Sequence, residues 1–341
     1  MKEFTGFKRG INLGGWLSQC VHTKEHYDSF IGESDIAQIA SWGLDHVRLP
    51  IDYNLIQNDD GSFIEEGFRY IDDCLAWCGK YKLNIIIDLH KAAGYFFHDS
   101  DEANTFFKSE DVQNIFYDLW GELARRYGKF SNAAFELLNE VVDTGVAKQW
   151  NMIARKAVER IREYAPQIPV LIGGVNNNSV ARVPELDPPC DEYIVYNFHF
   201  YEPLIFTHQS AYWIEGMPLD FEMDYPCTLA DALKYSEMHL PWGKDVEYNK
   251  MEREMVDDGF IEEMISEAVK TAAERGVALY CGEYGIIDRV NERSTINWYR
   301  DMNKVFTKYG IGRAAWNYKE LDFGLIGEHY DNIREEIIAL L

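Results

Sequence analysis

Short apolar runs alternate along the chain with longer segments of helical periodicity, and this order constrains the fold most strongly. The runs rich in Val, Ile, Leu and Tyr predict strands at residues 8–12, 46–51, 84–90, 133–139, 169–174, 193–200, 278–283 and 312–317. Helical patterns lie near residues 34–42, 67–81, 111–128, 146–164, 258–276, 291–309 and 330–341. Strand–helix alternation is typical of a parallel sheet. Eight repeats favour an α/β fold of the closed (β/α)8 type, the TIM barrel.

Two local features refine this prediction. The helix expected after the fifth strand is weak or replaced by the Pro-rich stretch Val183–Pro189. No G-x-G-x-x-G follows the first strand, which removes the usual signature of an open dinucleotide-binding sheet. We therefore expect residues 1–341 to form one barrel domain.

Residues 202–255 interrupt the strand–helix alternation, because they separate the sixth strand from the helix that should follow it. This segment carries Trp213, Trp242, several Tyr and many acidic residues. A structureless loop of that length is unusual in a compact domain. We expect a small helical insertion at the C-terminal rim, where the active sites of barrels lie. We interpret it as a lid or a wall of the binding groove; the alternative is a surface insertion with no role in the function.

Composition limits the classes of partner. The net charge is −24, from 57 acidic and 33 basic residues, so the surface should repel phosphate backbones and anionic membranes. Aromatic residues make up 14% of the chain, which hints at a groove for flat ligand faces. The six cysteines show neither a disulfide framework nor paired zinc knuckles. We expect a monomer that binds neither nucleic acid nor membranes.

The N-terminus bears no long apolar run and no small-residue cleavage site. No stretch approaches the roughly 20 apolar residues of a membrane span. A full-length product would therefore be cytoplasmic. A chain whose signal peptide had been removed would look the same and would be secreted.

Polar side chains stand at the predicted C-terminal strand ends, where they should face one site. They are Arg48, His90, Asn139, Glu140, His199, Tyr201, Glu283 and the aromatic Trp316. Any one of them could be structural, and a carboxylate that ends a strand is often the N-cap of the next helix. The convergence of so many on one barrel mouth is harder to explain as packing and indicates an active site.

Two carboxylates, Glu140 and Glu283, should face each other across this mouth. Glycoside hydrolysis needs such a pair, with separations of about 5–5.5 Å for retention and roughly 6.5–9.5 Å for inversion. Arg48 near Glu283 would keep that carboxylate ionised as a nucleophile. His199 and apolar neighbours near Glu140 would favour the protonated form of the second carboxylate.

The segment FELLNE (135–140) resembles the Asn-Glu signature of glycoside hydrolase family 5. Companion motifs follow in order: RGINLGGW (9–16), HVRLP (46–50), DLH (88–90), NFHFY (197–201), CGEYG (281–285) and AAWNY (314–318). They run through nearly the whole chain at barrel spacing. The overall pattern, including the long insertion, is similar to bacterial endoglucanases of the endoglucanase C type.

The resemblance implies a role for each matching position. Glu140 would be the general acid/base and Glu283 the nucleophile, with His199 beside the first. Tyr201 and Arg48 would position the nucleophile. The remaining three would contact the sugar: Asn139 at the 2-hydroxyl, His90 near the cleavage point, and Trp316 as a platform under the ring. A β-glucan oligo- or polysaccharide would be the substrate, and no cofactor is implied.

Alternative functions remain open from the sequence. A metal-dependent hydrolase needs clustered His and carboxylate ligands, but the first strand lacks a His-x-His pair. Asp88, two residues before His90, is expected to orient another group rather than to bind a metal. A non-catalytic carbohydrate-binding barrel would lack one of the carboxylates. The segment RGINLGGWL (9–17) also resembles fungal exo-1,3-β-glucanases, and β-mannanases share the same eight residues. We expect a retaining endo-β-glucanase that acts on β-1,4 or mixed-linkage β-1,3-1,4-glucan, and a site without metal.

Overall fold

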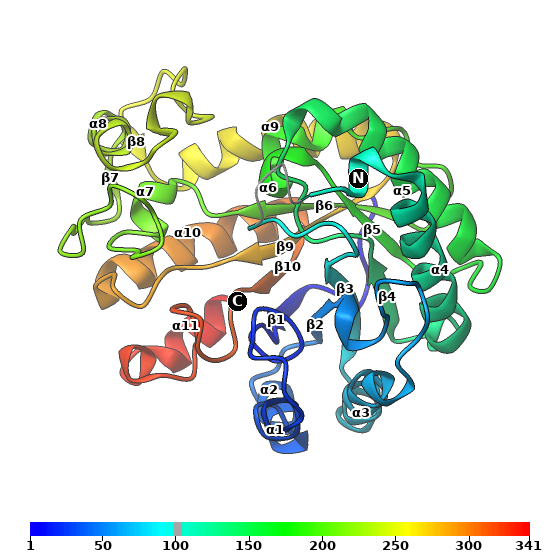
Figure 1. The fold of residues 1–341 in the computed structure, drawn as a ribbon. Helices are drawn as coiled ribbons and strands as arrows, with labels where there is room; N and C mark the ends of the chain where they lie inside the picture. The colour runs from blue at the N-terminus through cyan, green and yellow to red at the C-terminus, as the bar shows by residue number, and fades with distance from the viewer. Residues whose placement is uncertain (99–103) are drawn as a thin grey trace.

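The computed structural model describes residues 1–98 and 104–341 and contains a closed barrel of parallel strands (Figure 1). The barrel strands are β1 (Arg9–Asn12), β2 (His46–Asp52), β3 (Asn84–Lys91), β4 (Ala133–Glu136), β5 (Val170–Gly173), β6 (Ile194–Phe200), β9 (Ala278–Tyr284) and β10 (Gly312–Ala315). They pair in the order β1-β10-β9-β6-β5-β4-β3-β2, and β1 also pairs with β2. The prediction of a TIM barrel is therefore confirmed.

Helices surround the strands, and all of them except α1 lie where the periodicity predicts. They are α1 (Lys24–Ser29), α2 (Glu33–Ser41), α3 (Glu65–Tyr81), α4 (Glu110–Tyr127), α5 (Ala147–Arg162), α9 (Asp258–Arg275), α10 (Glu292–Tyr309) and α11 (Arg334–Leu340). Side chains cap several N-termini, as when Asp257 accepts a hydrogen bond from the amide of Phe260. After β5 the chain forms only α6 (Val175–Asn178) and a 3-10 segment, Val180–Glu185. The prediction of a missing or weak helix at this point is confirmed.

The barrel interior has an apolar lower part that closes the N-terminal end. Its buried members are Phe4, Phe7, Ile86, Ala134, Leu171, Val195, Ala278, Tyr280 and Ala314. Phe4 and Phe7 come from the segment before β1, and their rings stack at 4.2 Å. Because this end is filled, ligands can reach only the opposite end, where the strands finish.

A bulge in β9 turns Glu283 into the barrel. Tyr280 points inward, so strict alternation would send a residue three positions later outward. The pairing of β9 with β6 shifts register between Phe198 and His199, and His199 pairs with Glu283. A Cβ at Gly282 would lie 2.9 Å from the side chain of Asn197, so the bulge needs a residue without one.

The insertion, residues 202–255, follows β6; α8 is its longest element, and turns and irregular chain make up most of the rest. It contains α7 (Leu204–Thr207), β7 (Cys227–Thr228), α8 (Leu229–His239), a 3-10 turn (Gly243–Asp245) and β8 (Met255–Val256). The short strands β7 and β8 pair antiparallel, a small sheet that the sequence analysis did not predict. In Figure 1 these yellow-green elements lie together on one side of the ring of strands.

In the described part of the chain, no helix is both long enough and apolar enough to cross a membrane. All six cysteines are free thiols, and Cys74 and Cys78 are buried in α3. Trp120 is fully buried, while Trp42 and Trp77 pack against the core with part of their surface exposed. These three tryptophans therefore contribute to the core.

Candidate active site

The structure brings all eight predicted site residues together at the C-terminal end of the barrel. Hydrogen bonds and ion pairs connect six of them. Arg48 contacts Asn139 and Glu283, and Tyr201 also contacts Glu283. His199 lies between Glu140 and Glu283. The other two, His90 and Trp316, stack on each other beside this group. The site is therefore one contact network.

Arg48, fully buried in β2, lies at the centre of this network. Its Nε and Nη2 donate to the two carboxylate oxygens of Glu136, at 2.7 and 2.8 Å. Nη1 donates to Oε1 of Glu283 at 2.8 Å, and Nη2 lies 3.0 Å from Oδ2 of Asp88. Two amide oxygens complete the shell, those of Asn12 at 2.9 Å and Asn139 at 2.8 Å. A planar guanidinium can engage this many acceptors because its donors point in fixed directions.

The charges around Arg48 are unbalanced, because one cation faces three carboxylates. Burial opposes the charge of Arg48, but its carboxylate partners outweigh burial and raise its pKa well above the ordinary value. Burial raises the pKa of Asp88 to about 7, against the opposing effect of Arg48. The pKa of Glu136 is raised for the same reason. Proton uptake by these two groups relieves the excess negative charge.

Glu283 is held by hydrogen-bond donors on both oxygens. Arg48 donates to Oε1, and the hydroxyl of Tyr201 donates to Oε2 at 3.0 Å. Both contacts stabilise a carboxylate anion. The side chain is only 7% exposed, which restricts it to one orientation toward the barrel mouth.

Glu140 follows the end of β4 and is less buried than Glu283. Its Oε1 lies 2.8 Å from Nδ1 of His199, and its Oε2 accepts a hydrogen bond from Nδ2 of Asn177 at 3.0 Å. The hydroxyl of Tyr95 donates to the backbone carbonyl of Glu140 and accepts from the amide of Val142. Burial raises the pKa of Glu140, while the hydrogen bond from Asn177 lowers it. The expectation that its surroundings favour protonation holds in direction, with burial as the main cause.

Burial disfavours the charged form of two histidines of the site. Burial lowers the pKa of His199 to about 4 and also lowers the pKa of His90. Among the described residues, Nε2 of each ring has no hydrogen-bond partner. Nδ1 of His90 lies 2.8 Å from Oδ2 of Asp88, so the group that Asp88 orients is this ring. Both Nε2 atoms are buried, and a Cβ at Gly282 would lie 3.1 Å from that of His199.

Trp316 forms a wall next to His90. The two rings are nearly parallel, with centroids 5.8 Å apart. A Cβ at Gly14 would come within 2.6 Å of the indole, so only glycine permits this position. Asn317 fixes the same segment, because its side chain bonds both the amide and the carbonyl of Gly14.

Glu140, His199 and Glu283 each offer an atom that lies within 4.8 Å of the other two. On distance alone these three residues could hold a metal ion. The same distance brings an oxygen of Glu140 within 4.8 Å of an oxygen of Glu283. A carboxylate pair this close matches the separation of about 5 Å that direct nucleophilic attack requires.

Four supporting residues were missed by the sequence analysis: Asn12, Glu136, Asn177 and Asn197. Glu136 pairs in register with Asp88 and accepts a hydrogen bond from Nδ2 of Asn197. A carboxylate inside an otherwise apolar strand was a usable signal for Glu136. Asn177 offered no comparable signal, because its role depends on the path of a loop.

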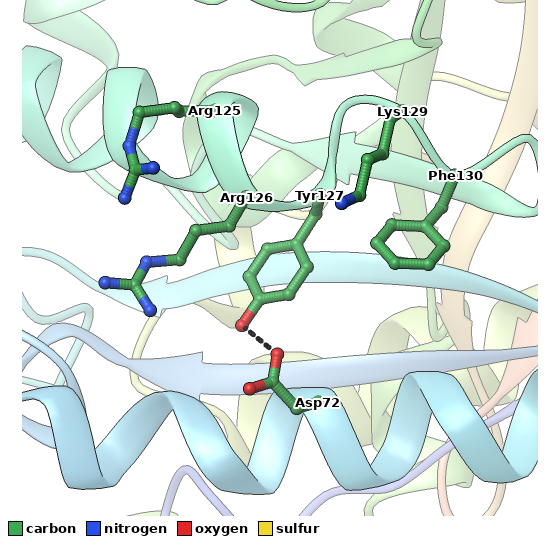
Figure 2. A pocket seen from close by; sticks show the side chains of 6 residues that line it. All are labelled: Asp72, Arg125, Arg126, Tyr127, Lys129 and Phe130. Atoms are coloured by element: carbon green, nitrogen blue, oxygen red, sulfur yellow. Dashed lines mark hydrogen bonds between the residues drawn. The ribbon is translucent and has the colours of Figure 1, made fainter.

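A second hollow of about 350 Å³ lies far from these residues, between α3 and the end of α4 (Figure 2). It is lined by Asp72, Arg125, Arg126, Tyr127, Lys129 and Phe130. Tyr127 donates to Asp72, and both guanidinium groups are paired with Glu122. The end of α4 leads into the start of β4, so this hollow is remote from the barrel mouth.

Comparisons with known proteins agree with this geometry. Residues 9–322 match the sequence model described as cellulase (glycosyl hydrolase family 5). Cellodextrinase A of Ruminococcus flavefaciens is 44% identical over 316 residues, covering 92% of this chain and 86% of that protein. Endoglucanase C of Acetivibrio thermocellus is 40% identical over 340 residues, covering 98% of each.

Solved structures share the fold. The crystal structure of a hyperthermophilic endo-beta-1,4-glucanase in complex with substrate superposes with a TM-score of 0.77. It is 20% identical and covers 98% of this chain, with 97% of that chain matched. At this identity the match shows the common barrel alone.

The central role of Arg48 can be tested by Arg48→Gln. Removing the cation leaves Asp88 and Glu136 buried without their counter-charge, so we expect a loss of about 3–5 kcal/mol in unfolding free energy near neutral pH. Both carboxyls have pKa values raised in the folded state. The stability that they contribute is present at low pH and is lost as the pH rises from the ordinary carboxyl range through about 7.

Urea unfolding at pH 5 and pH 8 measures this effect. The difference in unfolding free energy between Arg48→Gln and the parent should be smaller at pH 5 than at pH 8. Arg155→Gln is a matched control, because that arginine forms only an exposed pair with Glu159. Equal losses at both pH values would contradict the assignment of the excess charge to Asp88 and Glu136.

Proposed function

The chain belongs to the cellulase family, glycosyl hydrolase family 5, and we propose that it cleaves β-1,4-glucan chains internally by a retaining double displacement. The observation that carries the retaining mechanism is the approach of Glu140 and Glu283 to within 4.8 Å. Inversion requires a wider gap that admits a water molecule between the carboxylate and the sugar.

In the first step, we assign Glu283 as the nucleophile that bonds to the anomeric carbon. Arg48 and Tyr201 hold its two oxygens, which leaves little freedom for the carboxylate to turn away. Glu140 transfers its proton to the leaving glycosidic oxygen as the bond to the anomeric carbon breaks. The raised pKa of Glu140 supports this role, because more of the group is protonated near neutral pH.

In the second step, Glu140 removes a proton from a water molecule, which attacks the anomeric carbon and releases Glu283. His199 suits both steps, because a neutral imidazole accepts from a protonated carboxyl in one tautomer and donates to a carboxylate in the other. Asn139 contributes to sugar binding. Its Oδ1 already accepts from Arg48, so its Nδ2 can donate to a substrate hydroxyl.

Substitution of the two carboxylates should separate their roles. Glu283→Gln should lower kcat at least 10⁴-fold on every substrate while leaving the fold intact, because no covalent intermediate can form. Glu140→Gln should be equally slow on cellooligosaccharides but far less impaired on an aryl glycoside whose leaving group needs no proton. Steady-state kinetics on both substrates, with NMR of the first-formed anomer, checks these expectations. An α-configured first product would contradict retention.

A metal-dependent hydrolase is the competing mechanism, since Glu140, His199 and Glu283 could bind an ion by distance. Each of these residues has another use in the network, and Arg48 already neutralises Glu283. We therefore expect full activity after dialysis against EDTA. Loss of activity that zinc restores would favour the metal mechanism.

Relatives support the proposed substrate class, because those named above are an endoglucanase and a cellodextrinase. The aromatic side chains of the insertion support a groove wall on the Tyr201 side. The His208 ring lies 5.1 Å from that of Tyr201 and 6.2 Å from that of Trp213, which is 44% exposed. The rings meet edge to face, with interplanar angles of 78° and 81°, so the exposed ring of Trp213 is the one placed to stack on a sugar.

Activity on four polymers tests the substrate assignment. We expect a rapid fall in viscosity on carboxymethylcellulose and on barley mixed-linkage β-glucan, together with slower release of reducing ends. Reducing sugar from laminarin without a fall in viscosity elsewhere would favour exo-1,3 action. Activity confined to mannan would leave the mechanism and replace the substrate.

A further inference from the structure

Residues Asn176, Asn177 and Asn178 form a left-handed turn, here called the asparagine turn. Their φ angles are 58, 55 and 56°. Residues other than glycine rarely adopt positive φ angles, and asparagine is among those that tolerate them best. Asn178 stabilises the turn because its Oδ1 accepts from the amide of Gly174 at 3.0 Å. A specific arrangement of the chain is thus maintained next to the barrel mouth.

The asparagine turn contacts the acid/base directly. Nδ2 of Asn177 donates to Oε2 of Glu140 at 3.0 Å, and the amide of Asn177 donates to the carbonyl of Val141 at 3.1 Å. His199 lies on the other oxygen of Glu140. Asn177 is exposed, whereas His199 is buried. Asn177 therefore holds the carboxyl from the solvent side and fixes its rotation.

The insertion reaches the same turn through Glu247. Its Oε1 accepts from Nδ2 of Asn176 at 3.0 Å, and its Oε2 accepts from Oγ of Ser179 at 2.6 Å. These two residues flank Asn177 closely on both sides. Nε of Arg182 lies 3.9 Å from Glu247 and balances its charge. One carboxylate of the insertion therefore spans the asparagine turn.

We propose that Asn177 is a positioning residue for Glu140, and that Glu247 of the insertion holds Asn177 in place. This inference rests on the proposed function, in which Glu140 is the acid/base. It gives the insertion a part in proton transfer as well as in shaping the groove.

The chemistry sets the direction of the effect. A hydrogen bond from Asn177 stabilises the carboxylate form of Glu140, while burial favours the protonated form. The charged and titratable groups that also face Glu140 in the described part of the chain are Arg48, Asp88, His90, His98, His199, Tyr201 and Glu283. Loss of the Asn177 amide should leave these groups in place, raise the pKa of Glu140 and free its carboxyl to rotate.

Kinetics of Asn177→Ala on two substrates test the proposal. The alkaline limb of the kcat/KM profile should move up by roughly 0.5–1 pH unit, as expected for the loss of a hydrogen bond of ordinary net strength from an exposed side chain. On cellooligosaccharides kcat should fall about 10-fold, since general acid catalysis contributes roughly 10²–10⁴-fold. On an aryl glycoside with an activated leaving group the loss should be under about 3-fold, because that bond breaks without a proton.

Glu247→Ala should reproduce the same pattern more weakly. The double variant should be no slower than Asn177→Ala, because both changes act through one contact. Asn249→Ala is the matched control, since within residues 1–98 and 104–341 that exposed side chain bonds only the carbonyl of Lys244 in its own turn. Circular dichroism and thermal unfolding confirm that each variant is folded.

Glu140→Gln separates the outcomes. Suppose that Glu140→Gln is selectively slow on cellooligosaccharides, whereas Asn177→Ala loses activity equally on both substrates and shows no shift of the pH profile. The role of Asn177 is then wrong, while the proposed function stands. If Glu140→Gln also shows equal losses on both substrates, the acid/base assignment and the proposed function fail first. An additive loss in the double variant would overturn the link through Glu247.

Discussion

The buried guanidinium of Arg48 is the interaction on which the site depends. Its partners stand on four strands, namely Asn12 on β1, Asp88 on β3, Glu136 on β4 and Glu283 on β9. Arg48 therefore connects these strands across the barrel interior. Desolvation of so many charged groups is costly, and the geometry must be good to offset that cost. The structure meets this requirement with a bidentate contact to Glu136 and single contacts elsewhere. Arg48 therefore holds Glu283 in place and sets the electrostatic field around it.

Two carboxylates with different surroundings follow from this arrangement. Glu283 lies beside Arg48 and is buried, whereas Glu140 follows the end of β4 and contacts His199 and Asn177. Separate environments of this kind allow one carboxyl to act as a nucleophile and the other as an acid. The two carboxylates differ because Arg48 donates a hydrogen bond to Glu283, whereas His199 and Asn177 are the partners of Glu140.

The insertion approaches the site from two directions. Rings lead from Tyr201 through His208 to the exposed Trp213, on the side of Glu283. Glu247 binds the asparagine turn on the side of Glu140. Because side chains of one inserted segment contact the surroundings of both carboxylates, the insertion is part of the site architecture rather than a surface addition.

The amino-acid sequence by itself determined the order of strands and helices, because hydrophobic periodicity is a local property. It also located the eight site residues, since polar groups at the ends of apolar strands must face the barrel mouth. Glu136 was missed even though it lies inside the recognised segment FELLNE. Its partners Arg48 and Asn197 stand on other strands, and only the register of the closed sheet places them beside it.

Only the tertiary structure decided how the two carboxylates face each other. Alternation along β9 would direct Glu283 away from the barrel, and a bulge at Gly282 reverses it. The contact of Asn177 with Glu140 depends on three consecutive left-handed residues, which propensity does not predict. Distances between residues far apart in the chain depend on strand register, barrel closure and loop paths, and none of these is encoded in a local pattern.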